Sequence, residues 1–161
     1  MADSNDAVTE EQCLLIPQRQ TPLLLPSASV IEIIGYRELK EGGEAAPAWL
    51  LGRFEWRHLQ LPLISMERLL GVERQRRRGR KRIIVIHVFD ERLKYPFVGV
   101  DATGMPRLVN IDEAALKVEA SEGWPLEWPV LYKVSVQGNE ALVPDLDRLG
   151  DLIVSLEPAA A

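Results

Sequence analysis

Short apolar segments separated by turn residues run along most of the chain. Residues 30–34 (VIEII) and 83–89 (IIVIHVF) are dense in β-branched side chains, which suit a buried, pleated strand. Leu59, Leu61 and Leu63 alternate with their neighbours at period two, the spacing of a strand with one buried face. This pattern predicts a chain built mainly of strands.

The predicted elements are short and closely spaced. Other apolar segments predict strands at residues 14–16, 23–25, 49–54, 56–64, 97–100, 131–136 and 141–143. Gly104 and Pro106 predict that any strand within residues 102–110 is short or distorted, because proline removes a backbone donor. Helical spacing is confined to residues 66–70 and 147–156. Many short strands with little helix indicate an all-β fold made of small β-barrels.

A weak internal similarity supports two related half-domains. Residues 61–71 (LPLISMERLLG) and 143–152 (VPDLDRLGDL) both run from a strand through a proline to an acidic-Arg-Leu turn. The two segments differ in register by two residues, so the similarity is weak evidence on its own.

Composition places the chain among ordinary globular domains. It has 161 residues, of which 47% are apolar and 27% charged, enough for one domain with its own core. Residues 1–12 are polar and acidic and predict a disordered tail. They lack the basic start of a signal peptide, and no apolar run approaches the roughly 18 residues of a membrane helix. We therefore expect a cytoplasmic protein.

The sequence offers little material for catalysis or metal binding. One cysteine and two histidines exclude an intrachain disulfide and argue against a zinc or iron–sulfur site, so no cofactor is expected. Asp145 and Asp147 are better explained by a solvated turn than by acid–base chemistry, and His87 by a strand position. Cys13 is expected to be a small buried side chain. The prediction is a protein that is not an enzyme.

Positive charge is concentrated in one segment. Residues 73–82 hold seven basic residues and one acidic residue, which leaves a net charge of −11 on the rest of the chain. This basic segment could be a solvated hairpin loop, a docking loop for an acidic partner, or a nucleic-acid contact that neutralises phosphates. The docking or phosphate-binding side chains would be Arg74, Arg76, Arg77, Arg78 and Arg80. The acidity of the remaining chain argues against nucleic acid.

The order of these segments resembles the CheW family of chemotaxis coupling proteins. Family members have a V-x-E-I strand, a glycine, an Asn-x-Arg-Gly turn, an apolar strand with a proline, and a helix start. This chain has Val30, Glu32 and Ile33 in VIEIIGY, and then Gly52, Arg57 and Pro62 in residues 52–71. The resemblance continues through the strand at 83–89 and through Val100-Asp101. It ends at Asp147-Arg148-Leu149 and so spans residues 13–156.

The resemblance implies a fold and a function. The family fold is two small SH3-like five-stranded β-barrels around a shared apolar core with a short C-terminal helix. It predicts one domain over residues 13–157, with the first barrel at about 13–89 and the second at about 90–157. The family has no catalytic activity. It couples the cytoplasmic tip of methyl-accepting chemoreceptors to the regulatory domain of a CheA-type histidine kinase, and other CheW-like proteins are further candidate partners.

The resemblance also implies a partner-binding site. By resemblance, Val30, Glu32, Ile33 and Arg57 occupy positions that hold the receptor tip in the groove between the barrels, and His58 beside Arg57 is included with them. An aliphatic centre beside a Glu–Arg pair is typical of a protein contact with a charged rim. The alternative is that Val30 and Ile33 are simply core residues of their strand.

The chain also departs from the family pattern. Glu55 and His58 replace the Asn and Gly of the turn, and Ser65 replaces the acidic helix start. A further departure is the segment with Gly104 and Pro106. These differences predict a divergent, accessory member similar to ChpC-like coupling proteins, which act in chemosensory systems that control type IV pili and twitching motility.

Overall fold

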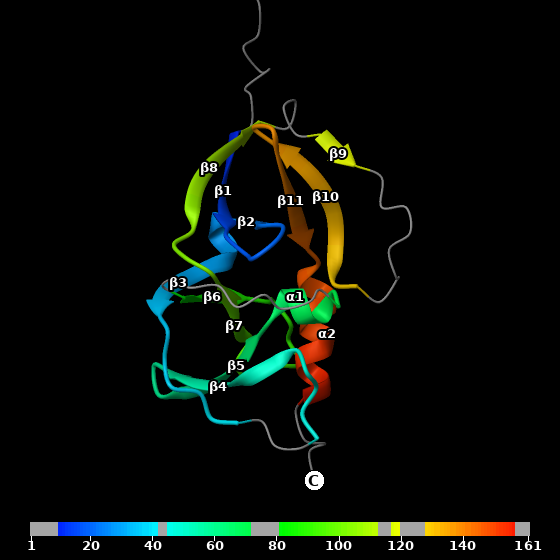
Figure 1. Cartoon of the computed structure of the whole chain (residues 1–161). Coiled ribbons are helices and arrows are strands. Elements are labelled where there is room, and N and C mark those ends of the chain that lie inside the picture. The colour runs from blue at the N-terminus through cyan, green and yellow to red at the C-terminus, as the bar shows by residue number, and fades with distance from the viewer. Residues whose placement is uncertain (1–9, 42–44, 72–80, 113–116, 120–127, 157–161) are drawn as a thin grey trace, which may run out of the picture.

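The computed structural model describes residues 10–41, 45–71, 81–112, 117–119 and 128–156, and their strands form two sheets. Sheet A has the order β8-β1-β2-β11-β10-β9, and sheet B has the order β3-β6-β7-β5-β4. Figure 1 shows the sheets at opposite ends of the molecule. The strands of sheet A are β1 (Glu10–Ile16), β2 (Leu23–Pro26), β8 (Arg107–Asp112), β9 (Lys117–Glu119), β10 (Val130–Val136) and β11 (Asn139–Pro144). Those of sheet B are β3 (Val30–Gly35), β4 (Leu50–Trp56), β5 (Leu59–Ile64), β6 (Arg82–His87) and β7 (Phe97–Ala102).

The dense apolar strands are buried on both faces. In β6, Ile83 and Val85 belong to a core enclosed by sheet B, whereas Ile84 and Ile86 belong to a core shared with sheet A. Sheet A has its own core, which includes Cys13 and Val134. A strand buried on both faces has an unbroken apolar sequence, which is the reason for the run at residues 83–86.

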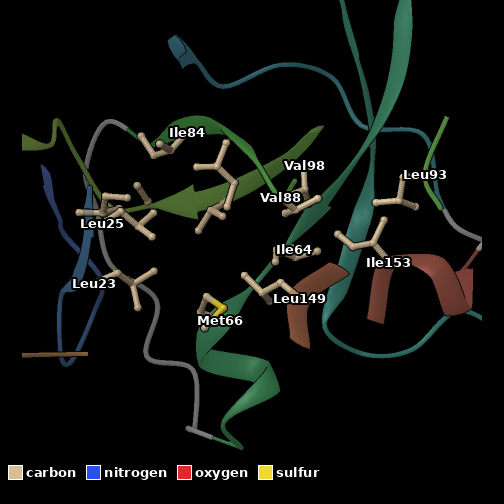
Figure 2. Packing of buried hydrophobic residues seen from close by; sticks show 14 residues of the cluster. Leu23, Leu25, Ile64, Met66, Ile84, Val88, Leu93, Val98, Leu149 and Ile153 are labelled. Atoms are coloured by element: carbon tan, nitrogen blue, oxygen red, sulfur yellow. The ribbon is translucent and has the colours of Figure 1, made fainter. Parts of the chain in front are cut away.

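The shared core joins both sheets to the C-terminal helix. Its fully enclosed members include Leu25 from β2, Ile64 from β5 and Leu149 from α2 (Leu146–Leu156) (Figure 2). Met66 at the start of α1 (Met66–Leu69) packs into the same cluster. The three cores give the two-lobed architecture that the sequence resemblance implies, and the predicted fold class is confirmed.

Sheet B curls so that its two outer strands meet. Lys40, which follows β3, exchanges backbone hydrogen bonds with Arg53 of β4, at 2.8 Å in both directions. The indole Nε1 of Trp56 in β4 donates a 2.7 Å hydrogen bond to Glu32 in β3. These contacts bring the edges of the sheet together around its own core, as in a small barrel.

The strand pairing differs from the expected division of the chain at residue 89. β1 and β2 pair with the C-terminal strands of sheet A, whereas β7 belongs to sheet B. Sheet A also contains a sixth strand, the three-residue β9. Residues 10–12 of the expected tail form the start of β1, and residues 1–9 lie outside the described residues. β8 is a regular six-residue strand because Pro106 precedes it and therefore costs no ladder hydrogen bond.

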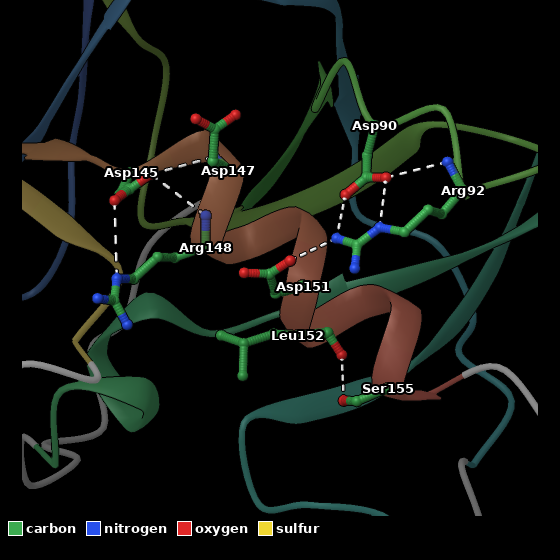
Figure 3. A network of polar contacts seen from close by, with 8 residues as sticks. All are labelled: Asp90, Arg92, Asp145, Asp147, Arg148, Asp151, Leu152 and Ser155. Atoms are coloured by element: carbon green, nitrogen blue, oxygen red, sulfur yellow. Dashed lines mark hydrogen bonds and ion pairs between the residues drawn. The ribbon is translucent and has the colours of Figure 1, made fainter.

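The two segments with similar sequences adopt similar structures. Each is the second strand of a hairpin followed by a helix, β5 before α1 and β11 before α2. Ser65 accepts a hydrogen bond from the backbone N–H of Arg68 in α1. Asp145 accepts from the backbone N–H groups of Asp147 and Arg148 in α2 (Figure 3). These side chains satisfy helix N-termini, so Asp145 has a structural role as a helix cap.

Candidate partner-binding site

Glu32 lies where the core of sheet B reaches the surface. It follows the same alternation in β3 as buried Ile34, which places its carboxylate at the end of that core. Oε2 of Glu32 accepts the hydrogen bond from Trp56 and lies 3.6 Å from a guanidinium nitrogen of Arg57. The side chains of Arg57 and Glu32 remain 64% and 42% exposed. The predicted Glu32–Arg57 couple therefore exists, and it is accessible to a partner.

The turn between β4 and β5 sets the position of Arg57. Arg57 and His58 both adopt left-handed backbone conformations, with φ of 48° and 64°. A two-residue hairpin of type I′ requires positive φ at both central positions, and its twist matches that of the flanking strands. His58 is exposed at the tip of this turn beside Arg57. The guanidinium of Arg57 lies over the Trp56 ring, 4.4 Å from its centroid, in a cation–π contact.

Aromatic rings continue from Trp56 across sheet B. The Trp56 and Phe97 centroids are 5.3 Å apart, those of Phe97 and His87 are 5.1 Å apart, and those of His87 and Phe89 are 4.1 Å apart. We call these four residues the aromatic row. The sequence indicates only a strand position for His87 and has no signal for the row, because its members come from β4, β6, β7 and the β6–β7 loop. Only the pairing of β6 with β7, which sets His87 opposite Phe97, brings two of them together.

The side chains of Val30 and Ile33 lie in a different environment from that of Glu32. Both are partly buried and pack against the shared core between the sheets. A register shift in β3 between Val30 and Glu32 separates the two groups. These side chains support the core, as the second alternative expects, and their part in partner binding stays a prediction. Ile31, on the same strand, is 39% exposed.

Other predicted residues do not join this site. Arg74, Arg76, Arg77, Arg78 and Arg80 lie outside the described residues. A docking role or a nucleic-acid contact of these residues therefore stays a prediction. Cys13 is buried, and burial, followed by the nearby Glu11, raises the pKa of its thiol. Among the described residues, no group of His, Cys, Asp or Glu is arranged to hold a metal ion.

A charged network joins the β6–β7 loop to α2. Arg92 donates to both carboxylate oxygens of Asp90, at 3.0 and 2.7 Å, and also contacts Asp151 of α2 (Figure 3). The side-chain and backbone hydrogen bonds from Arg92 lower the pKa of Asp90 below its ordinary value of 3.8. Hydrogen bonds to Asp90 and Asp151 raise the pKa of Arg92. This network fixes the loop that contains Phe89.

Comparison with models of known protein families shows to which family this chain belongs. The model of the CheW-like domain matches residues 12–150. The chain belongs to the CheW-like domain family. This match covers both sheets and the Glu32–Arg57 couple, and it supports a general role in chemotaxis coupling.

Comparison with solved structures agrees on the fold. The scaffolding protein TtCheW from Thermoanaerobacter tengcongensis is similar, with a TM-score of 0.70 and 12% sequence identity. The similarity covers 84% of this chain and 89% of that one. A search of curated proteins finds no match. Within the described residues, no helix is long and apolar enough to cross a membrane.

Proposed function

We propose that this chain is a non-enzymatic adaptor that couples the cytoplasmic tip of a chemoreceptor to the regulatory domain of a CheA-type histidine kinase. Its place of action would be the cytoplasm, at membrane-associated chemosensory arrays. Membership of the CheW-like family supports the coupling role. The single structural observation that carries the proposal is the exposed guanidinium of Arg57, held between Glu32 and the Trp56 ring.

That arrangement suits recognition of a protein surface. The Trp56 ring and the Glu32 carboxylate restrict the Arg57 side chain before any partner arrives, so less conformational entropy is lost on binding. Arginine is enriched among residues that dominate binding energy, because its guanidinium presents several donors in a rigid plane. At 3.6 Å, the contact with Glu32 leaves donors of Arg57 free to meet a partner carboxylate or carbonyl.

More specifically, we propose that this chain is an accessory adaptor similar to ChpC-like coupling proteins, in a chemosensory system that controls type IV pili and twitching motility. Its support is the set of departures from the family pattern, including His58 in place of the turn glycine. The basic residues Arg74, Arg76, Arg77, Arg78 and Arg80 would serve this adaptor as a docking loop for an acidic partner, such as another CheW-like protein.

Arg57→Glu tests the proposal directly. We expect wild-type protein to bind the kinase regulatory domain or the receptor tip saturably in calorimetric titrations at physiological salt. Arg57→Glu should weaken that binding by about tenfold or more, since it places two carboxylates together and removes the donors. Lys40→Glu is the matched control, because it makes the same charge change at an exposed position whose backbone, not side chain, bonds to Arg53.

Two results would contradict the proposal: a wild-type chain that binds neither partner, or an Arg57→Glu variant that binds as tightly as Lys40→Glu. Ile33→Asp is a poorer test, although the sequence resemblance suggests it. Ile33 packs against the shared core, so a buried carboxylate there would lower the stability of the fold as well as binding.

A further inference from the structure

Phe89 is an unusual residue on the surface of this protein. Its side chain is 63% exposed, and its backbone is left-handed, with φ of 54°. The described residues include four non-glycine residues with positive φ, which are Arg57, His58, Phe89 and Gln137. Bulky side chains rarely adopt this conformation, and it persists where surrounding structure enforces it.

The surroundings of Phe89 hold its ring outward. Its backbone N–H donates a 3.0 Å hydrogen bond to Nδ1 of His87, and the two rings lie 4.1 Å apart. The loop that follows is fixed to α2 through Asp90, Arg92 and Asp151. A Cβ atom added at Gly150 would lie only 2.6 Å from Oδ2 of Asp90, which shows how closely loop and helix pack. The exposed ring is therefore preorganised.

The aromatic row connects Phe89 to the Glu32–Arg57 couple. From Phe89 it runs through His87 and Phe97 to Trp56, on which the guanidinium of Arg57 lies. Trp56 itself is only 3% exposed, whereas Phe89 and Arg57 at the two ends are both open to solvent. The row therefore fixes an exposed apolar group and an exposed cation relative to each other. Two of the four left-handed residues, Phe89 and Arg57, belong to this one assembly.

We infer that Phe89 and Arg57 are the two anchor points of one docking surface. Its occupant is a protein partner that places an aliphatic or aromatic side chain on Phe89 and a carboxylate at Arg57. The Glu32 carboxylate accepts from Trp56 and contacts Arg57, but it leaves other donors of the Arg57 guanidinium unused. Because the guanidinium is positively charged, the complementary group on the partner is a carboxylate. The inference rests on the proposed function, to which it adds Phe89 and the chemistry of the partner.

Phe89→Gly is the deciding variant. Glycine removes the ring and tolerates φ of 54°, so the midpoint of thermal unfolding should stay within a few degrees of wild type. The probes are the kinase regulatory domain and the receptor tip, titrated separately by calorimetry. For one of the two probes, we expect affinity to fall about tenfold or more with Phe89→Gly. Phe89→Leu should stay within about threefold, because it keeps an apolar contact.

Leu131→Ser is the control, since it removes an apolar side chain that is 46% exposed on β10 of sheet A. It should leave the affinity for the probe that Phe89→Gly weakens unchanged. Equal affinity of Phe89→Gly and wild type for both probes would overturn the inference and leave the proposed function intact. A parallel loss of stability and binding in Phe89→Gly would also overturn it, because the residue would then support the fold. A wild-type chain that binds neither probe would end both proposals.

Discussion

His58 has a left-handed backbone conformation, which is unfavourable for a residue with a bulky side chain. At φ of 64° it stands where the CheW-like pattern has glycine, and Arg57 beside it is also left-handed. The equivalent hairpin of sheet A has Gln137 followed by Gly138, which meets the same turn geometry with less strain. The β4–β5 turn therefore keeps a side chain at its tip at a cost in stability, which is typical of residues that contact a partner.

Replacing His58 with glycine should stabilise the protein. Glycine relieves the left-handed strain but loses more entropy on folding, so we expect a net gain of about 0.5–1 kcal/mol in the free energy of unfolding. Urea denaturation measures this change. Gly138→His is the reciprocal variant and should lower stability, because φ at position 138 is 80°. An added Cβ meets no atom within 4 Å, so the loss would come from backbone strain and not from a clash. Destabilisation by His58→Gly would show that the imidazole stabilises the folded state.

The connection of the β6–β7 loop to α2 predicts a dependence of stability on pH. Hydrogen bonds from Arg92 lower the pKa of Asp90 in the folded state, so the ionised form stabilises the fold. That contribution is complete above the ordinary pKa of 3.8 and disappears as the pH falls through the lower folded-state pKa. We expect Asp90→Asn to lose less stability than wild type on acidification from pH 5 to about pH 3.

Thermal melts of both proteins across this pH range test the prediction. Asp147→Asn is a suitable control, because it removes an exposed carboxylate of α2 that is not part of the Asp90 network. If Asp90→Asn and wild type lost stability in parallel below pH 4, the connection between loop and helix would not depend on the charge of Asp90.

The elements themselves were largely predictable from local sequence. β-Branched density predicted β6, and the apolar segments at 131–136 and 141–143 predicted β10 and β11. Pairing between distant strands was not predictable, because no local pattern shows that β1 pairs with β8 or that β2 pairs with β11. The expected division at residue 89 fails for this reason. Boundaries also moved by a few residues, since strand ends depend on ladder partners.

The candidate site was predictable in part. Resemblance to the family pointed to Glu32 and Arg57, and the structure brings them within 3.6 Å. Trp56 was not identified as the second partner of Glu32, although its alternation with Phe54 could have placed it on the inner face of β4. The role of Phe89 depends on its backbone conformation and on ring contacts between strands, for which the sequence has no signal.

At the scale of the whole molecule, the architecture suits an adaptor. Two curled sheets with separate cores share a third core, so that the molecule is one body with two ends. The Glu32–Arg57 couple and the aromatic row lie at sheet B, which leaves the outer surface of sheet A for a second partner. Exposed Leu131 and Tyr132 of β10 are apolar side chains on that surface.

Sedimentation velocity with both proposed partners tests the central claim most directly. The chain is mixed with the kinase regulatory domain and the receptor tip, singly and together, at physiological salt. The adaptor account predicts a ternary complex that sediments faster than either binary complex and is reduced by Arg57→Glu. Mutually exclusive binary complexes, or no complex with either partner, would contradict coupling by this chain.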